Sequence, residues 1–154
     1  MTKILTAELI DWANDYLEND QRHAQFEALG ASCFGVFGAE QGKVSTQVRN
    51  LQSIVNTAVR FADIEFFIKN QLGRDNDAAK KWARLAPHPL EQLKQLADET
   101  NPAGQCCSVP GSLQASAKEL VVPLRLYLAQ GWVRGVVGGY MFAKAQRENL
   151  IQQG

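Results

Sequence analysis

Apolar side chains recur at helical spacing over residues 45–72, and this pattern constrains the fold of the chain more than any other. Six of these side chains fall on one stripe, and Ile54, Phe61 and Ile68 widen it. Gly73, a residue type favoured just past a helix C-terminus, follows the pattern. The spacing therefore predicts a single long helix that forms the spine of the core. The stripe comprises Val48, Leu51, Val55, Ala58, Ala62 and Phe66.

The segments before this spine differ sharply in pattern. Residues 6–29 carry apolar residues at spacings of three and four, which predicts an amphipathic helix with Thr6 as its N-cap. Residues 30–43 hold four glycines, and each glycine disfavours a helix by roughly 1 kcal/mol relative to alanine. We expect a glycine-rich loop there, ahead of the central helix.

The segments after the spine also read as helices. Asp75 is placed to cap a second helix that stops before Pro87, and residues 89–99 predict another short one. Residues 101–112 are rich in turn formers. The run from Leu113 toward Leu150 is helical in pattern, and Pro123 must start it, kink it or divide it.

Together these patterns predict an all-α fold, a compact bundle of about five to six helices in a single domain over residues 1–154. Three segments make up this domain: an acidic helix and glycine-rich loop over 1–44, basic helices over 45–99, and a helical region over 113–150. A chain of 154 residues is long enough for one hydrophobic core.

Charge is unevenly distributed along this neutral chain. The 16 basic and 16 acidic side chains balance, yet residues 1–42 hold two basic and seven acidic ones. Residues 43–84 hold eight basic and four acidic ones. The middle third is therefore an electropositive block, which is typical either of a solvated helix face or of a polyanion site.

The stretch ending in Gly42-Lys43 resembles a nucleotide-binding loop only superficially. That motif, G-x-x-x-x-G-K-[ST], needs its first glycine where Phe37 stands and a hydroxyl where Val44 stands. Gly38 precedes Gly42 by four positions instead of five. The departures argue against an ATPase.

The sequence shows no motif for a catalytic site or a metal site. Cys33, Cys106 and Cys107 lack metal-ligand spacing, and His23 and His88 have no nucleophile beside them. The sequence predicts no catalytic residue, no metal and no cofactor. Charged residues interrupt the C-terminal apolar run, which excludes a membrane helix, and the N-terminus lacks signal-peptide character. We expect a cytoplasmic protein.

Polar residues follow one side of the predicted spine and suit a phosphate backbone. Arg49, Ser53, Asn56 and Arg60 share a stripe, and Ser45 is placed as the helix N-cap. Free amides at a helix N-terminus attract anions. The sequence therefore predicts a phosphate contact, to which further basic residues add charge: Lys43, Lys69, Arg74, Lys80, Lys81 and Arg84.

Three segments carry a family resemblance. "STQVRNLQSIVNTA" resembles the T-S-Q-[IV]-R-x-[LI]-L signature of the small helical subunit of Csm-type, type III CRISPR interference complexes. "FFIKNQLGRDNDAAKKWARLA" is similar to that family's helix ending in a glycine-arginine pair, and "LRLYLAQGWVRGVVGGYMFAKAQ" to its C-terminal helix. The matches cover residues 45–85 and 120–146 in the family's order.

The resemblance implies a non-catalytic subunit of an antiviral defence complex, stacked in several copies along its inner filament. Its expected partners are guide RNA, target RNA and the other subunits of the complex, and it would contact RNA backbone without reading sequence. The signature arginine falls on Arg49 and that of the glycine-arginine pair on Arg74. With the charge argument, the expected RNA-binding residues are Lys43, Arg49, Arg60, Lys69, Arg74 and Lys81.

A second interpretation starts from the glycines near the C-terminus. Gly131, Gly135 and Gly139 recur every four residues and would form a groove free of side chains on a helix. Such a groove favours close packing of another helix, either within the chain or from a second copy. The alternative function is therefore a helical protein–protein adaptor or homodimerisation domain that binds no RNA.

Overall fold

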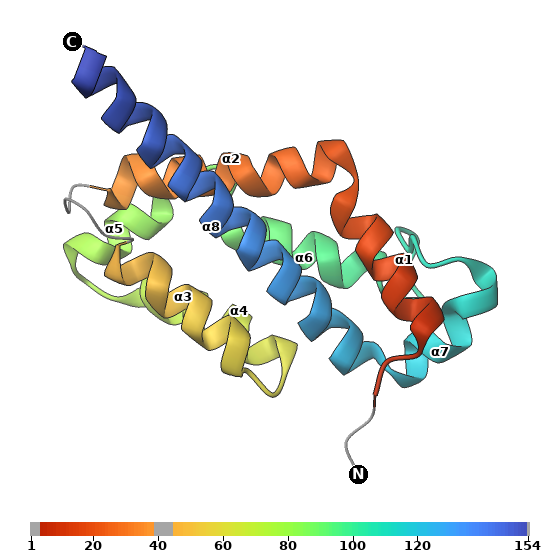
Figure 1. The fold of residues 1–154 in the computed structure, drawn as a ribbon. Helices are drawn as coiled ribbons and strands as arrows, with labels where there is room; N and C mark the ends of the chain where they lie inside the picture. Colours follow the sequence, from red (N-terminus) through yellow and green to blue (C-terminus); the bar gives the residue numbers. More distant parts are fainter. Residues whose placement is uncertain (1–3, 39–44, 154) are drawn as a thin grey trace.

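The computed structural model is all-helical, as the sequence predicts, and it describes residues 4–38 and 45–153 (Figure 1). These residues contain eight α-helices and one short 3-10 helix, which is more than the expected five to six, and no strand. The α-helices are α1 (Ala7–Glu18), α2 (Asp20–Phe37), α3 (Thr46–Thr57), α4 (Phe61–Gly73), α5 (Asp77–Ala83), α6 (Pro89–Glu99), α7 (Gln114–Glu119) and α8 (Val121–Gln153). The 3-10 helix η1 spans Gly111–Leu113.

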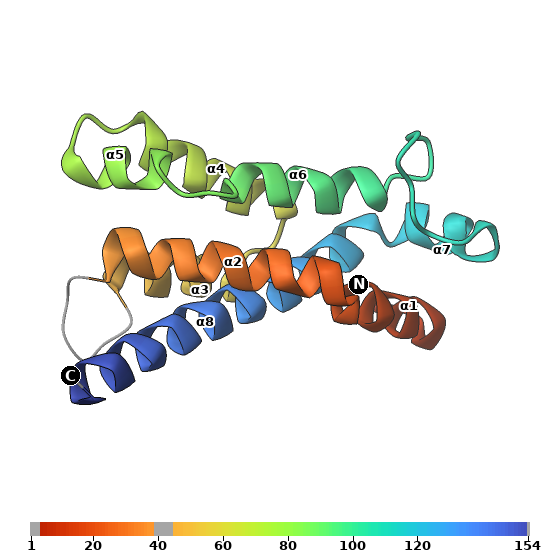
Figure 2. The same ribbon diagram turned by 90° about the horizontal axis from the view of Figure 1, so that it is seen from above.

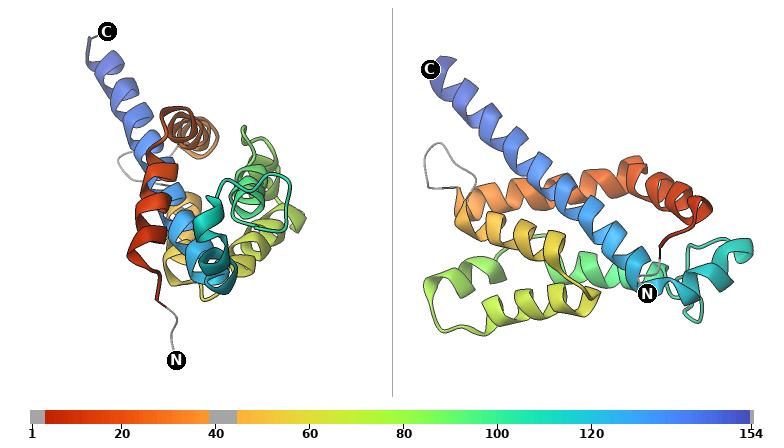
Figure 3. Two further views of the ribbon diagram at one scale, coloured as in Figure 1. Left: turned by 90° about the vertical axis from the view of Figure 1, so that its right-hand side faces the viewer. Right: turned by 60° about the horizontal axis from the view of Figure 1, so that its bottom comes forward.

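Helix α8 is the spine of the bundle. Its 33 residues span about 50 Å at 1.5 Å per residue, and its C-terminal end projects beyond the other helices (Figures 1 and 3). Seen from above, α4, α5 and α6 form one layer, while α1, α2 and α3 lie with α8 in the other (Figure 2). Within the described ranges, no helix has the length and apolar character needed to cross a bilayer.

The N-terminal pattern forms two helices instead of the expected one. The chain turns at Asn19, whose side chain accepts a hydrogen bond from Arg22 N at 3.1 Å and so caps α2. Asparagine competes for backbone donors in this way, which explains why α1 ends there. Thr6 caps α1 as predicted, since its Oγ1 accepts from Leu9 N.

The prediction of a glycine-rich loop from residue 30 onward is wrong for residues 30–37. Gly30 and Gly35 lie within α2, and only Gly38 caps its end. Gly30 faces α8 so closely that a Cβ there would lie 2.6 Å from Tyr140 N. The packing of α2 on α8 offsets the helix-weakening effect of this glycine.

The expected spine of residues 45–72 is also interrupted. Helix α3 ends at Thr57, and α4 begins after Arg60, whose N–H bonds to the carboxylate of Asp63. The break changes which side chains are buried. Val48, Leu51 and Val55 are buried as predicted, but in α4 the core positions are Phe61, Ile64 and Ile68, while Ala62 and Phe66 of the expected stripe are exposed.

The remaining helix boundaries follow local capping chemistry. Asn76, one residue later than the predicted Asp75, caps α5 by accepting a hydrogen bond from Ala79 N at 2.9 Å. His88 caps α6 through its Nδ1, which accepts from Leu90 N at 3.1 Å. Pro123 lies in the first turn of α8. Backbone N–H groups in a first turn have no acceptor within the helix, so the missing N–H of proline costs no hydrogen bond there. Pro123 therefore starts this helix and does not kink it.

The glycine stripe of α8 packs against its own chain. A Cβ on Gly135 would lie 2.9 Å from Phe26 Cβ, and one on Gly139 would lie 2.6 Å from Glu27 Cα. Gly131 faces Leu17 of α1 in the same way. The stripe therefore lets α1 and α2 approach α8, which leaves Gly135 and Gly139 buried and Gly131 half-buried.

A polar cluster joins α1, α2 and α6 at the edge of the core. The Tyr16 hydroxyl donates to Glu99, and the Arg22 guanidinium lies 3.5 Å above the Tyr16 ring and 3.4 Å from the Glu99 carboxylate. Burial, followed by the bond to Glu99, raises the pKa of Tyr16 well above its ordinary value. Ser108 donates to the same carboxylate at 3.0 Å and so anchors the turn-rich segment.

Two neighbouring glycines of α8 give a matched test of this packing. Gly139→Ala would place a methyl group into the backbone of α2 and should cost about 1–3 kcal/mol in the free energy of unfolding. Nothing lies within 4 Å of a Cβ on Gly138, so Gly138→Ala should be neutral or stabilise by up to about 1 kcal/mol. Thermal unfolding should separate the variants by several degrees; equal melting temperatures would contradict the close approach.

Candidate functional site

The structure gathers most of the predicted basic residues on α3, α4 and α5. Arg49 is exposed on α3, Lys69 is exposed on α4, and Arg74 is exposed at the C-cap of α4. Lys81 is half-buried on α5. Lys43, the remaining predicted lysine before α3, lies outside the described residues, as does the Gly42-Lys43 stretch to which it belongs.

Arg60 differs from the other predicted RNA-binding residues because it pairs with a carboxylate at the start of α4. It precedes α4 instead of continuing α3, so the predicted polar stripe from Arg49 to Arg60 does not exist as one helical face. Its Nη2 lies 3.2 Å from the Asp63 carboxylate, and its N–H bonds to the same group at 3.3 Å. Its charge is therefore matched locally, and capping explains its position.

The N-terminus of α3 borders a small cavity of about 140 Å³. Ser45, Thr46 and Gln47 line it from α3, while Phe37 comes from α2 and Lys81 from α5. Ser45 caps the helix as predicted, because its Oγ accepts from Val48 N at 3.3 Å. The first-turn amides of Thr46 and Gln47 have no hydrogen-bond acceptor among the described residues.

Buried contacts fix this cavity from two sides. Trp82, fully buried on α5, donates its indole N–H to Gln47 Oε1 at 2.9 Å, which joins α5 to the start of α3. Tyr140 of α8 accepts a hydrogen bond from Ser45 N at 3.2 Å through its hydroxyl. The ring of Tyr140 packs edge-on against Phe34 of α2, with centroids 5.4 Å apart. Helices α2, α3, α5 and α8 thus position one helix N-terminus.

Several cations of α3, α4 and α5 have no ion pair among the described residues. The ion pairs of the described residues join Arg22 to Glu99, His23 to Glu27, Arg60 to Asp63, and Lys144 to Glu148. A shallow hollow of about 490 Å³ on α5 is lined by three of the unpaired cations together with Asp77 and Ala83. In residues 4–38 and 45–153, the cations of α3 to α5 that form no ion pair are Arg49, Lys69, Arg74, Lys80, Lys81 and Arg84.

Sequence reasoning missed the role of Thr46 and Gln47, which line the cavity. The signal was present in part, since the predicted cap at Ser45 implies free amides in the next turn. Helical periodicity could not show that Lys81 lines the same cavity as Thr46, 35 residues earlier. Their proximity depends on how α5 packs across the start of α3.

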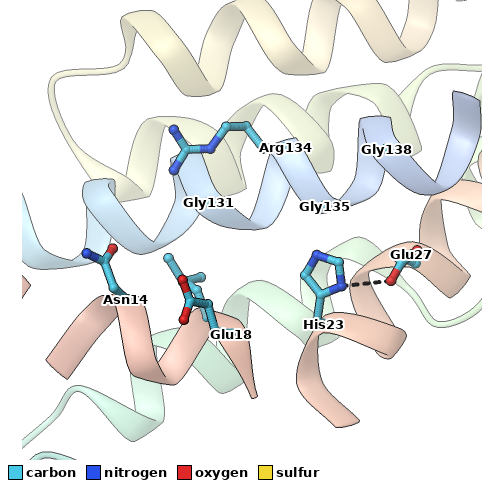
Figure 4. A pocket seen from close by; sticks show the side chains of 9 residues that line it. Asn14, Glu18, His23, Glu27, Gly131, Arg134, Gly135 and Gly138 are labelled. Atoms are coloured by element: carbon cyan, nitrogen blue, oxygen red, sulfur yellow. Dashed lines mark ion pairs between the residues drawn. The ribbon is translucent and has the colours of Figure 1, made fainter. Parts of the chain in front are cut away.

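A second concave region lies between α8 and the first two helices (Figure 4). This groove of about 350 Å³ has Gly131, Gly135 and Gly138 along one side and Glu18 and His23 on the other. His23 Nδ1 lies 2.7 Å from the Glu27 carboxylate, and Arg134 also lines the groove. Its mixed charges and solvent-exposed histidine form no arrangement of nucleophile and base.

Cys33 is buried, and His88 is engaged in helix capping. Burial raises the pKa of the Cys33 thiol to about 12, which leaves it protonated. Burial lowers the pKa of His88, with Glu91 opposing the shift, and its Nδ1 is occupied by helix capping. No group of three or more histidine, cysteine or carboxylate side chains in residues 4–38 and 45–153 could hold a metal ion.

The contact between Ser45 and Tyr140 can be tested by removing one oxygen atom. Tyr140→Phe should leave the buried Ser45 N–H without an acceptor and lower the free energy of unfolding by about 1–3 kcal/mol. Tyr127→Phe is the control, since its hydroxyl bonds to the half-buried Asn14, which water can reach. Denaturant unfolding should show the larger loss for Tyr140→Phe; the opposite order would argue against this anchor.

Comparisons with protein-family models, with curated proteins and with solved structures find no match to this chain. The resemblance to the Csm-type small subunits accordingly consists of the sequence motifs in residues 45–85 and 120–146.

Proposed function

We propose that the surface formed by α3, α4 and α5 binds the phosphate backbone of RNA. The observation that carries the proposal is the cavity at the start of α3, which Thr46, Gln47 and Lys81 line, and where the amides of Thr46 and Gln47 have no acceptor among the described residues. Free amides at a helix N-terminus and a nearby ammonium group together bind phosphate. A phosphate held there needs no contact with a base.

Cations on α3 and α4 add to this site. Arg49, Lys69 and Arg74 are exposed and free of ion pairs within the described ranges, so their charge is available to an RNA strand. Backbone contacts of this kind position a nucleic acid and do not read its sequence. Binding should therefore tolerate any sequence and weaken steeply as salt rises.

Because the chain has no net charge, we expect RNA to be bound by several copies acting together. The 16 basic and 16 acidic side chains balance overall, so one isolated copy should hold RNA weakly. Acidic residues are concentrated on α1, at the opposite end of the bundle from α5 and its lysines (Figures 1 and 2). Oppositely charged ends suit head-to-tail stacking, and stacked copies on one RNA would gain avidity.

These properties support the role that the sequence motifs imply. We assign the chain as the non-catalytic small subunit of a type III CRISPR effector complex, which binds guide or target RNA and stacks along a filament. Arg49 and Arg74 match the family's arginines, and both belong to the unpaired cations of this surface.

The alternative, a protein adaptor that binds no RNA, has its support in exposed apolar side chains of α8. Met141 and Phe142 are 43% and 61% exposed, which favours contact with another protein. Most of the glycine stripe no longer supports that alternative, because Gly135 and Gly139 are buried against α2 of the same chain. A contact through Met141 and Phe142 is equally compatible with a place among other subunits.

Salt dependence gives a direct test of the backbone contacts. The plot of log K against log salt for single-stranded RNA falls with a slope of about −0.7 for each phosphate contact. Arg49→Ala and Arg74→Ala should each weaken RNA binding by the assembled complex and reduce that slope by about 0.7. Binding to unrelated RNA sequences should weaken equally.

Two controls accompany this measurement. Lys118→Ala removes a cation from α7, far from α5 in the bundle, and should leave the slope unchanged (Figure 1). Circular dichroism should show that each variant retains its helices, because Arg49 and Arg74 are exposed. An unchanged slope and affinity in both arginine variants would remove this surface as the RNA site.

A further inference from the structure

The outer face of α4 carries an aromatic ring that the core does not use. Phe66 is 65% exposed, although the continuous helical pattern would have buried it. Val59, just before the helix, is 78% exposed, and Ala62, one turn before Phe66, is exposed as well. An exposed aromatic side chain in the middle of a helix is available to a ligand.

The charges around Phe66 indicate the chemistry of that ligand. Lys69, one turn further along α4, is exposed and without an ion pair in the described ranges, and Asn70 lies beside it. Of the two carboxylates of α4, Asp63 is bound by Arg60 at 3.2 Å, and Glu65, four residues before Lys69, forms no ion pair with it in the described ranges. The face therefore presents an aromatic ring close to a cation without an ion pair, which complements an anion that also has a flat apolar part.

A nucleotide meets both requirements. Exposed aromatic rings bind unpaired bases by stacking, and neighbouring lysine or arginine groups hold the phosphates on either side. Arg74 lies eight residues after Phe66, about 12 Å along the helix axis, and Lys69 lies between them. A single strand following α4 could thus place a base on the ring while its backbone reaches the cations.

We propose that Phe66 is a stacking platform for an unpaired base of the bound RNA. The inference rests on the proposed RNA-binding function and adds to it a contact with the base itself. Every base has a flat face, so stacking on Phe66 is compatible with binding that is independent of sequence. The site selects single-stranded or flipped-out nucleotides, since a base inside a duplex cannot reach the ring.

Equilibrium binding of the full chain to labelled single-stranded RNA tests this contact. Phe66→Ala should weaken binding about 5- to 150-fold without changing the salt slope, because no charge is removed. Phe66→Tyr keeps the ring and should bind like the wild type. Val59→Ala, which trims an equally exposed apolar side chain without a ring, is the matched control.

An RNA with abasic positions separates stacking from backbone contact. On this probe, which keeps its phosphates, Phe66→Ala and the wild type should bind equally. Wild-type affinity for intact RNA in Phe66→Ala would overturn the stacking contact and leave the backbone site standing. A loss of self-association with RNA binding intact would assign Phe66 to a protein contact instead. Absence of any salt-dependent RNA binding by the wild type would overturn both proposals.

Discussion

The close approach of α2 and α8 is the constraint on which the rest of the structure depends. Gly30 and Gly139 remove side chains from the two facing surfaces, so that backbone meets backbone across the crossing. The crossing brings Phe34 of α2 against Tyr140 of α8, and Tyr140 in turn holds Ser45 at the start of α3. Packing between two apolar helices therefore determines where the candidate phosphate cavity lies.

The sequence predicted the helical class and the features that depend on nearby residues. The caps at Thr6 and Ser45 and the helix from Pro89 to Glu99 are confirmed, since each depends on side chains within one turn. The sequence did not reveal the break between α3 and α4, because no glycine or proline marks it. It depends on the Arg60–Asp63 pair and on burial of Ile64 and Ile68 in place of Phe66.

The glycines show most clearly why local pattern was insufficient. Glycine lowers helix propensity, so a cluster of four reads as a loop, yet Gly30 serves a helix crossing that only the tertiary fold reveals. For the candidate site, the cations could be named from the sequence, but the meeting of Lys81 with Thr46 could not. Arg60 was predicted from the sequence to contact RNA, but the structure pairs its side chain with Asp63.

We propose that this fold presents a helix N-terminus and cations without ion pairs in the described ranges to an RNA backbone, as one subunit of a larger assembly. Purification of the full chain from its native cells, followed by identification of what remains bound at low salt, tests this proposal. The expected result is short RNA of defined length together with larger partner proteins, all released as salt rises. A nucleic-acid-free homo-oligomer would contradict it.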